Sequence, residues 1–273
     1  MKKLLILIAC LSIFLTGCTS QEAKEVISDI DSLGEITLDS FEMLQLVNDK
    51  YNALSEEEKA DISNIAILNA ANQRFNELKY ADLDSRIELA CNEISADNLG
   101  LLNELLQEYE NLSDSGKASI SNISLLEDSI VKCTELKAKE VTSTIKKKAN
   151  GSTREAKELL IENAAIMTDK QIESCLIEIG RWSFVGHAES YFQTMLKNPY
   201  SYKRYSGSCG TPELQDDGTY KTLIHLDYGA TNSFNAMVRD EVELYVYFTI
   251  NTETLTVSYE DTTLTLYYAW KFS

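Results

Sequence analysis

Few side chains in this sequence could do chemistry, and their spacing gives little support for catalysis. The two histidines are His187 and His225. His225 and Asp227 lie two residues apart in a strand-like segment, but a metal ion needs further protein ligands and none is in view. A Gly-x-Ser-x-Gly nucleophile motif and a glycine-rich phosphate loop are both missing. We therefore predict a protein that is not an enzyme, without metal or cofactor, in which His225 and Asp227 form a solvated polar face.

Tyrosines near the C-terminus form a sharper pattern. Tyr245 and Tyr247 alternate with the apolar residues of segment 242–250, and Tyr267 alternates with those of segment 264–272. If the face that carries these three tyrosines is exposed, it could hold a peptide or a sugar ring. The alternative is that residues 141–181 cover this face, which would make the tyrosines structural.

Asn232 and Arg239 flank the connection between two predicted strands. We expect structural roles for both, because asparagine suits turns and arginine pairs readily with carboxylates. Asn232 would hold the turn, and Arg239 would pair with Asp240 or Asp227.

Cys18 closes the stretch Leu15-Thr16-Gly17-Cys18, which follows a cationic start and an apolar run over residues 4–15. This layout is that of a signal peptide, too short to span a bilayer. The stretch resembles the lipobox of bacterial lipoproteins, Leu-x-Gly/Ala-Cys. The resemblance implies that residues 1–17 are removed and that lipid on Cys18 anchors the protein to the extracytoplasmic face of the cell membrane. An ordinary secretory signal with an unrelated cysteine is the alternative.

The charge balance excludes one class of partner. The net charge is −18, and loss of residues 1–17 would remove two basic residues and no acidic ones. Such a surface repels polyphosphate backbones, so we expect no nucleic-acid partner. With 44 % hydrophobic residues, the chain has enough apolar material to bury one or two cores.

An internal repeat organises the first half of the chain. Segment 51–79 aligns with segment 109–137 at a shift of 58 residues, with identical tyrosines, lysines and leucines at matching positions. Apolar residues at three- and four-residue steps predict a helix in each copy: Phe41, Leu44, Val47, Tyr51 and Leu54, and then Leu99, Leu102, Leu105, Tyr109 and Leu112. Each copy also has a leading helix and a third helix.

Polar residues mark the predicted starts of the shorter helices. Ser55 and Glu58 form a capping box, and Ser113 can cap the equivalent helix although Gly116 replaces the glutamate. Asn64 and Asn122 are predicted N-caps of the third helices. The pattern Tyr-x-x-Leu-Ser-x-x-x-Lys-x-x-Ile-x-Asn resembles helical repeats of Gram-positive surface proteins. The resemblance implies a spacer or interaction module.

Four cysteines remain after Cys10 and Cys18 are assigned to the export segment. Cys91 and Cys133 occupy core positions of the same predicted bundle, so we predict a disulfide between them, against the alternative of two small buried thiols. A second disulfide between Cys175 and Cys209 would favour a covered tyrosine face. No cysteine lies at zinc-ligand spacing.

Composition changes near Trp182. Eleven of the 14 tyrosines and both prolines follow it. A helix around residues 188–196 precedes segments with alternating apolar residues, which predicts a helix packed on an antiparallel sheet of about four strands. Residues 141–181, with a helix that could end at Gly180, are either a helical hairpin or a degenerate third repeat.

The motifs Leu196-Lys-Asn-Pro199-Tyr-Ser and Asn232-Ser-Phe234-Asn-Ala-Met-Val-Arg239 resemble a small α+β domain that recurs in exported Firmicute proteins. This resemblance implies a fold and no activity. Asn235 stands where glycine is usual in that pattern.

The sequence as a whole predicts an α+β multidomain protein. It would be a membrane-anchored lipoprotein that binds a protein, peptide or envelope glycan through its C-terminal domain, or alternatively a structural spacer of the envelope with no small ligand. The predicted segments are a signal peptide over 1–17, a tether over 18–24, repeats over 25–83 and 84–140, the hairpin or third repeat over 141–181, and the α+β domain over 182–273.

Overall fold

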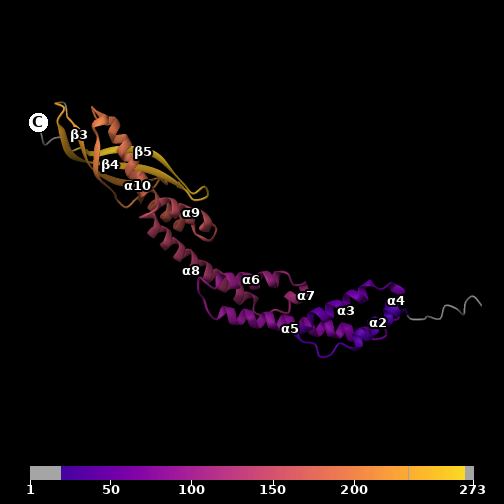
Figure 1. Ribbon diagram of the computed structural model, residues 1–273. Coiled ribbons are helices and arrows are strands. Elements are labelled where there is room, and N and C mark those ends of the chain that lie inside the picture. The colour runs from indigo at the N-terminus through magenta and orange to yellow at the C-terminus, as the bar shows by residue number, and fades with distance from the viewer. Residues whose placement is uncertain (1–19, 233, 268–273) are drawn as a thin grey trace, which may run out of the picture. The chain divides into compact units, whose positions relative to one another are not determined.

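The computed structural model describes residues 20–232 and 234–267, with side chains described as far as residue 264 (Figure 1). Cys18 therefore lies outside the described residues. The fold is α+β, with helices through most of the chain and an antiparallel sheet at its C-terminal end. The chain forms two compact units, residues 20–93 with 100–129 and residues 94–99 with 130–267.

The helices of the first half repeat with the spacing predicted from the sequence. The first copy contains α3 (Phe41–Ala53), α4 (Glu56–Ala60) and α5 (Ile65–Cys91), preceded by α2 (Gln21–Asp31) and the short 3₁₀ helix η1 (Leu38–Ser40). The second contains α6 (Leu99–Glu110), α7 (Asp114–Lys117) and α8 (Ile123–Ala149). Every helix of the second copy begins 58 residues after its counterpart.

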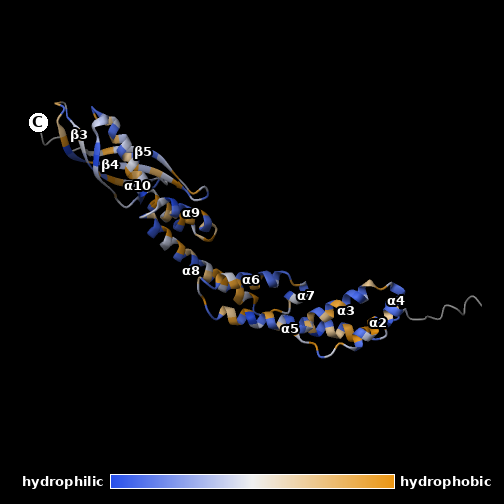
Figure 2. Cartoon of the chain, in the orientation of Figure 1, coloured by the Kyte–Doolittle hydropathy of each residue, from blue (hydrophilic) through white to orange (hydrophobic). Residues whose placement is uncertain are grey.

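Apolar stripes of α2, α3 and α5 form the core of the first copy. Figure 2 shows hydrophobic and hydrophilic residues interleaved along these helices. Apolar residues three and four positions apart lie on one side of a helix, and neighbouring helices pack these sides against each other. The buried residues are Ala23, Val26, Ile30, Leu33, Leu44, Val47, Leu54, Ile62, Leu68 and Ala71.

The predicted caps are present at the short helices. Ser55 Oγ accepts a hydrogen bond from Glu58 N, and Glu58 Oε2 accepts one from Ser55 N at 2.9 Å. Ser113 Oγ accepts from Gly116 N at 3.3 Å. Close packing explains the glycine at position 116, because a β-carbon at Gly116 would lie 2.9 Å from the ring of Tyr80.

Asn64 is the N-cap residue of α5 as predicted, but its side chain makes no capping hydrogen bond to the helix. Asn64 Nδ2 instead donates to the carbonyl oxygen of Ile27 on α2 at 2.9 Å. Asn122 makes the corresponding contact, from its Nδ2 to the carbonyl oxygen of Asp84 at 3.3 Å. Both asparagines tie the start of a third helix to the leading helix of the same copy.

The predicted segment boundaries fall inside continuous helices. The third helix of the first copy and the leading helix of the second are one helix, α5, so the boundary at 83/84 lies in its interior. The boundary at 140/141 lies inside α8 in the same way. The predicted tether over 18–24 is also too long, because α2 begins at Gln21 with Ser20 Oγ accepting from Ala23 N at 3.0 Å.

Residues 141–181 form a third bundle of three helical segments. The end of α8 packs with α9 (Thr153–Asn163) and the first half of α10 (Asp169–Met195), with the 3₁₀ helix η2 (Ala164–Ile166) between the last two. The buried residues are Val141, Ile145, Ala149, Ala156, Leu160, Ile172, Cys175 and Leu176. The end of α8, α9 and the start of α10 correspond to the leading, second and third helices of the earlier copies. The short helix α4 has no counterpart here, because only the 3₁₀ helix η2 joins α9 to α10.

Helix α10 runs through the predicted domain boundary at 181/182 without a break. Gly180 does not end the helix. A β-carbon at Gly180 would lie 2.7 Å from the ring of Phe184, so the glycine makes room for this ring one turn later. Thr168 and Gln171 form a capping box at the start of α10.

The second half of α10 covers one face of the sheet. The strands are β1 (Lys203–Cys209), β2 (Glu213–Leu214), β3 (Tyr220–Thr231), β4 (Met237–Asn251) and β5 (Thr256–Tyr267), in the order β1-β3-β4-β5 with β2 beside β3. The described pairs are antiparallel. The 3₁₀ helix η3 (Pro199–Ser201) joins α10 to β1.

Aromatic residues centre the core between α10 and the sheet. Phe184 stacks on Phe248 with ring centroids 4.3 Å apart, and Phe192 meets Tyr228 edge to face at 4.7 Å. The aliphatic residues of alternate positions on β3 and β4 complete this layer: Ile224, Leu226, Val242, Leu244 and Val246.

All four cysteines of the described residues are free thiols, so neither predicted disulfide is formed. Cys91 Sγ lies 3.7 Å from the carbonyl oxygen of Leu125, and Cys133 is fully buried. Cys175 belongs to the core of the third bundle, whereas Cys209 packs against the core between α10 and the sheet. Cys175 and Cys209 therefore belong to different hydrophobic cores. Among the described residues, no helix is long and apolar enough to cross a membrane.

Candidate functional site

The candidate site is the sheet face that lies opposite α10, which we call the open face. It carries the alternate residues of β3 and β4 that do not enter the core: Lys221, Leu223, His225 and Asp227, and then Arg239, Glu241, Glu243, Tyr245 and Tyr247. Helix α10 packs against β1, β3, β4 and β5 from the other side. In the described part of the chain, the third bundle reaches the sheet at Ile250, Leu255 and Val257 near the β4–β5 turn, and these contacts leave the open face uncovered.

Lys221 and two tyrosines form the aromatic end of the open face. In the register of β3 and β4, Leu223 lies opposite Tyr245 and Lys221 lies opposite Tyr247. The Lys221 ammonium lies 3.7 Å from the ring centroid of Tyr245 and 5.8 Å from that of Tyr247. Both rings are half-buried, as is the lysine. A cation held over an aromatic ring gains electrostatic energy from the negative ring face.

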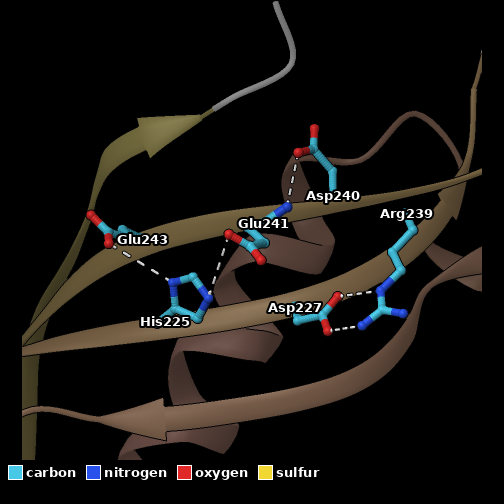
Figure 3. Close-up of polar contacts among 6 residues, drawn as sticks. All are labelled: His225, Asp227, Arg239, Asp240, Glu241 and Glu243. Atoms are coloured by element: carbon cyan, nitrogen blue, oxygen red, sulfur yellow. Dashed lines mark hydrogen bonds and ion pairs between the residues drawn. The ribbon is translucent and has the colours of Figure 1, made fainter. Parts of the chain in front are cut away.

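Carboxylates surround the imidazole in the middle of the open face (Figure 3). His225 Nδ1 lies 3.8 Å from Glu243 Oε1, and His225 Nε2 lies 3.9 Å from Glu241 Oε2. Both distances are too long for hydrogen bonds, so these are ion pairs only when the imidazole is protonated. Asp261 of β5 pairs with Tyr247 and adds a further exposed carboxylate beside the tyrosines.

Asp227 and Arg239 form the firmest polar contact of the open face. Arg239 Nε donates to Asp227 Oδ1 at 2.8 Å, and its Nη2 donates to Oδ2 (Figure 3). Asp227 was one of the two carboxylates expected to pair with Arg239. The hydrogen bonds and charge of the guanidinium lower the pKa of Asp227 below its usual value. The Asp227 side chain is only 12 % exposed, so this pair acts structurally between the two strands.

Asn232 holds the β3–β4 turn as predicted. Its Oδ1 accepts from Phe234 N at 2.9 Å and from Ala236 N at 3.1 Å. Asn235 has a φ of 61°, the left-handed conformation that asparagine tolerates. The turn leaves the Phe234 side chain 91 % exposed at the end of the sheet.

A second aromatic group lies at the other end of the open face, and sequence reasoning missed it. Tyr205 of β1 lies against Gly229, where a β-carbon would be 3.0 Å from its ring and 3.3 Å from Met237 Sδ. The Arg239 guanidinium lies 4.7 Å from the Tyr205 ring centroid. These residues come together only through strand register, so no pattern within one segment could have found them.

The structure describes the side chains of two of the three residues in the predicted tyrosine face. Tyr245 and Tyr247 lie on the open face, whereas the side chain of Tyr267 lies outside the described residues. The backbone of Tyr267 pairs with Val242. The described residues contain no group of three or more His, Cys, Asp or Glu side chains that could hold a metal ion, His225 and its neighbouring carboxylates included.

Comparison of the chain with protein-family models, with curated proteins and with solved structures finds no match. The function of the protein must therefore be inferred from the geometry of the open face.

Proposed function

We propose that this protein is a non-catalytic, membrane-anchored lipoprotein that binds an extended peptide or protein segment through the open face of its sheet. The observation that supports this proposal most directly is the asymmetry of the sheet. One face is filled by α10, while the other presents Tyr245 and Tyr247 with a row of charged groups beside them. A sheet face of tyrosines and charges offers flat contact area together with polar specificity.

The charges of the open face favour a cationic partner. Glu241 is largely exposed, and Asp261 lies next to the tyrosines. Arg239 is offset by its partner Asp227, and Lys221 is held over the tyrosine rings. The remaining charges are the carboxylates of Glu241, Glu243 and Asp261, so the open face has an excess of acidic groups. Basic side chains of a partner could pair with these carboxylates and stack on the rings that Lys221 now covers.

The open face is tested by recovering partners from solubilised membranes with the anchored protein as bait. The variant Tyr245→Thr/Tyr247→Thr keeps strand-forming residues but removes both rings. We expect it to lose a specific partner that the wild type retains. Tyr200→Thr is the matched control, because Tyr200 is 99 % exposed on η3 and lies off the open face.

Two outcomes would count against this assignment. Equal recovery of the partner by the double variant would place binding elsewhere, provided that its melting temperature stays close to that of the wild type. Recovery of envelope glycan in place of protein would replace the peptide with a sugar ligand.

The lipid anchor has its own test. Cells that express the protein are grown with a radioactive fatty acid, and we expect label on the wild type and none on Cys18→Ala. Cys91→Ala is a useful control because its thiol is buried in the fold. Label that persists on Cys18→Ala would contradict lipidation at this position.

A structural spacer is the alternative function, and the regularity of the two helical copies favours it. Helices α5 and α8 are both 27 residues long, and each begins at the same point of its copy. Such arrays build by neighbouring contacts and need no ligand. If no specific partner is recovered with any bait, the spacer becomes the better explanation.

A further inference from the structure

A cavity of about 230 Å³ lies on the α10 side of the sheet, apart from the open face. Its walls come from α10, from β1 and from the end of α8. Gly207 of β1 keeps the strand close to the helix, since a β-carbon there would lie 2.8 Å from Val185 Cγ1. The volume equals that of roughly eight water molecules at about 30 Å³ each, which is the size range of one amino acid.

One cation and one carboxylate line this cavity side by side. Arg181 Nη1 lies 3.6 Å from Glu178 Oε2, which is longer than a hydrogen bond. Arg181 Nε is buried and has no hydrogen-bond partner among the described residues. A buried donor without an acceptor is unfavourable, so the protein alone does not fully satisfy this guanidinium. Arg181 and Glu178 form an ion pair without a hydrogen bond, so each can still bind a ligand group of opposite charge.

An aromatic wall and a neutral thiol complete the cavity. Trp182 lines it and is 59 % exposed, an unusual state for the largest apolar side chain. Cys209 Sγ lies 3.4 Å from Thr222 Oγ1. Burial raises the pKa of the Cys209 thiol, an effect that Thr222 and Arg181 only partly offset. The thiol is thus neutral at pH 7 and adds no charge to the site.

We propose that this cavity binds a small zwitterion, namely a free amino acid with an apolar or aromatic side chain. The outer guanidinium nitrogens of Arg181 receive the ligand carboxylate, while Glu178 receives the ligand ammonium. The side chain of the ligand stacks on Trp182 and Val185. A bidentate guanidinium–carboxylate contact fixes orientation, and the adjacent glutamate selects against ligands that lack the amine.

Calorimetric titration of the full chain in detergent micelles tests this site, with L-phenylalanine as the probe. We expect saturable binding with a dissociation constant on the order of 1 mM or tighter. N-acetyl-L-phenylalanine lacks the ammonium and phenylalanine amide lacks the carboxylate, and each should bind at least tenfold more weakly. Absence of binding by L-phenylalanine, or equal binding of all three compounds, would overturn the proposal.

Variants of Arg181 and Glu178 test whether these two side chains bind the ligand. Arg181→Gln and Glu178→Gln should each weaken L-phenylalanine binding at least tenfold. Arg154→Gln is the matched control, since Arg154 pairs with Glu158 on the exposed side of α9 and touches no part of the cavity. Unchanged affinity in both cavity variants would contradict the assignment.

Alkylation of Cys209 gives a second readout that does not depend on variants. Cys209 is partly exposed in the cavity, whereas Cys91, Cys133 and Cys175 are buried. Saturating L-phenylalanine should slow alkylation of Cys209 in the folded protein several-fold. An unaltered rate at saturation would place the bound ligand elsewhere. Because neither measurement uses Tyr245 or Tyr247, failure here leaves the proposed function of the open face intact.

Discussion

The two faces of the sheet are built from alternate residues of the same strands, yet they have different chemistry. On β4, Val242, Leu244, Val246 and Phe248 are fully buried against α10, while the residues between them are half-buried and either charged or tyrosine. Strand geometry sends successive side chains to opposite sides, so a single segment supplies both a core and a surface. If the covered face supplies stability and the open face is free for contacts, substitutions on the two faces should differ in their effect on unfolding.

Removing a ring from the covered face should have the largest effect. Phe248 is fully buried and stacks on both Phe184 and Tyr220. We expect Phe248→Ala to lower the free energy of unfolding by about 3–5 kcal/mol, through lost burial and the cavity left behind. Chemical denaturation of the full chain measures this loss. Tyr247→Ala, one position earlier on the open face, should lose clearly less free energy of unfolding, and equal losses would show that both faces contribute alike to stability.

Two glycines of α10 test how tightly the covered face is packed. Gly180→Ala forces a β-carbon against the Phe184 ring and should destabilise the protein by about 1–3 kcal/mol. Gly186→Ala on the same helix has nothing within 4 Å of the new β-carbon. It should stabilise the helix by up to about 1 kcal/mol. Thermal melts of the two variants should shift in opposite directions, and shifts of the same sign would argue against close packing at Gly180.

The Asp227–Arg239 pair should make the open face sensitive to acid. The pKa of Asp227 is lowered by Arg239, so the pair stabilises the fold above the unfolded aspartate pKa, about 3.9, and this contribution is lost as the pH falls through the folded value. Arg239→Met should therefore destabilise the protein at pH 7 by less than Phe248→Ala does. The difference from wild type should shrink below about pH 4. A pH series of denaturation curves measures it, and a difference that is constant with pH would contradict this role.

The smallest effect is expected at Lys221. Removing its ammonium in Lys221→Gln loses the contact with the Tyr245 ring and should lower stability by about 0.5–1 kcal/mol. Lys203→Gln is the control, because Lys203 lies 5.3 Å from the Tyr205 ring centroid and should contribute less. Double-mutant cycles with Tyr245→Leu measure the coupling directly. A coupling no larger than that of the control pair would show that Lys221 is not held by the ring.

Much of this fold followed from periodicity. The stripe of Leu44 and Val47 predicted the second helix of the first copy, and the alternation over 242–250 predicted a strand that forms the second part of β4. The caps at Ser55 and Ser113 followed from side chains that accept hydrogen bonds from free backbone amides. These features depend on residues close together in sequence, which is why a single chain is enough to find them.

Helix continuity and strand register could not be found in this way. No residue between Leu78 and Ile87 interrupts a helix. The sequence pattern nevertheless does not indicate that the third helix of the first copy continues into the leading helix of the second. The contact of Lys221 with Tyr245 depends on how β3 pairs with β4, and the cavity beside Trp182 depends on how β1 meets α10. The expected disulfides failed for the same reason, because core positions in a sequence pattern do not give the distance between two sulfurs.

The unbroken course of α10 has a consequence for how the second unit unfolds. Its first half supplies Ile172 and Cys175 to one core, and its second half supplies Phe184 and Phe192 to another. Helical hydrogen bonding is cooperative, so fraying in one half removes support from the next turn. The third bundle and the sheet layer are thus expected to melt in a single transition. A protease that cuts surface loops would find no site between them, and a pulling force applied across them would be carried by the backbone of one helix.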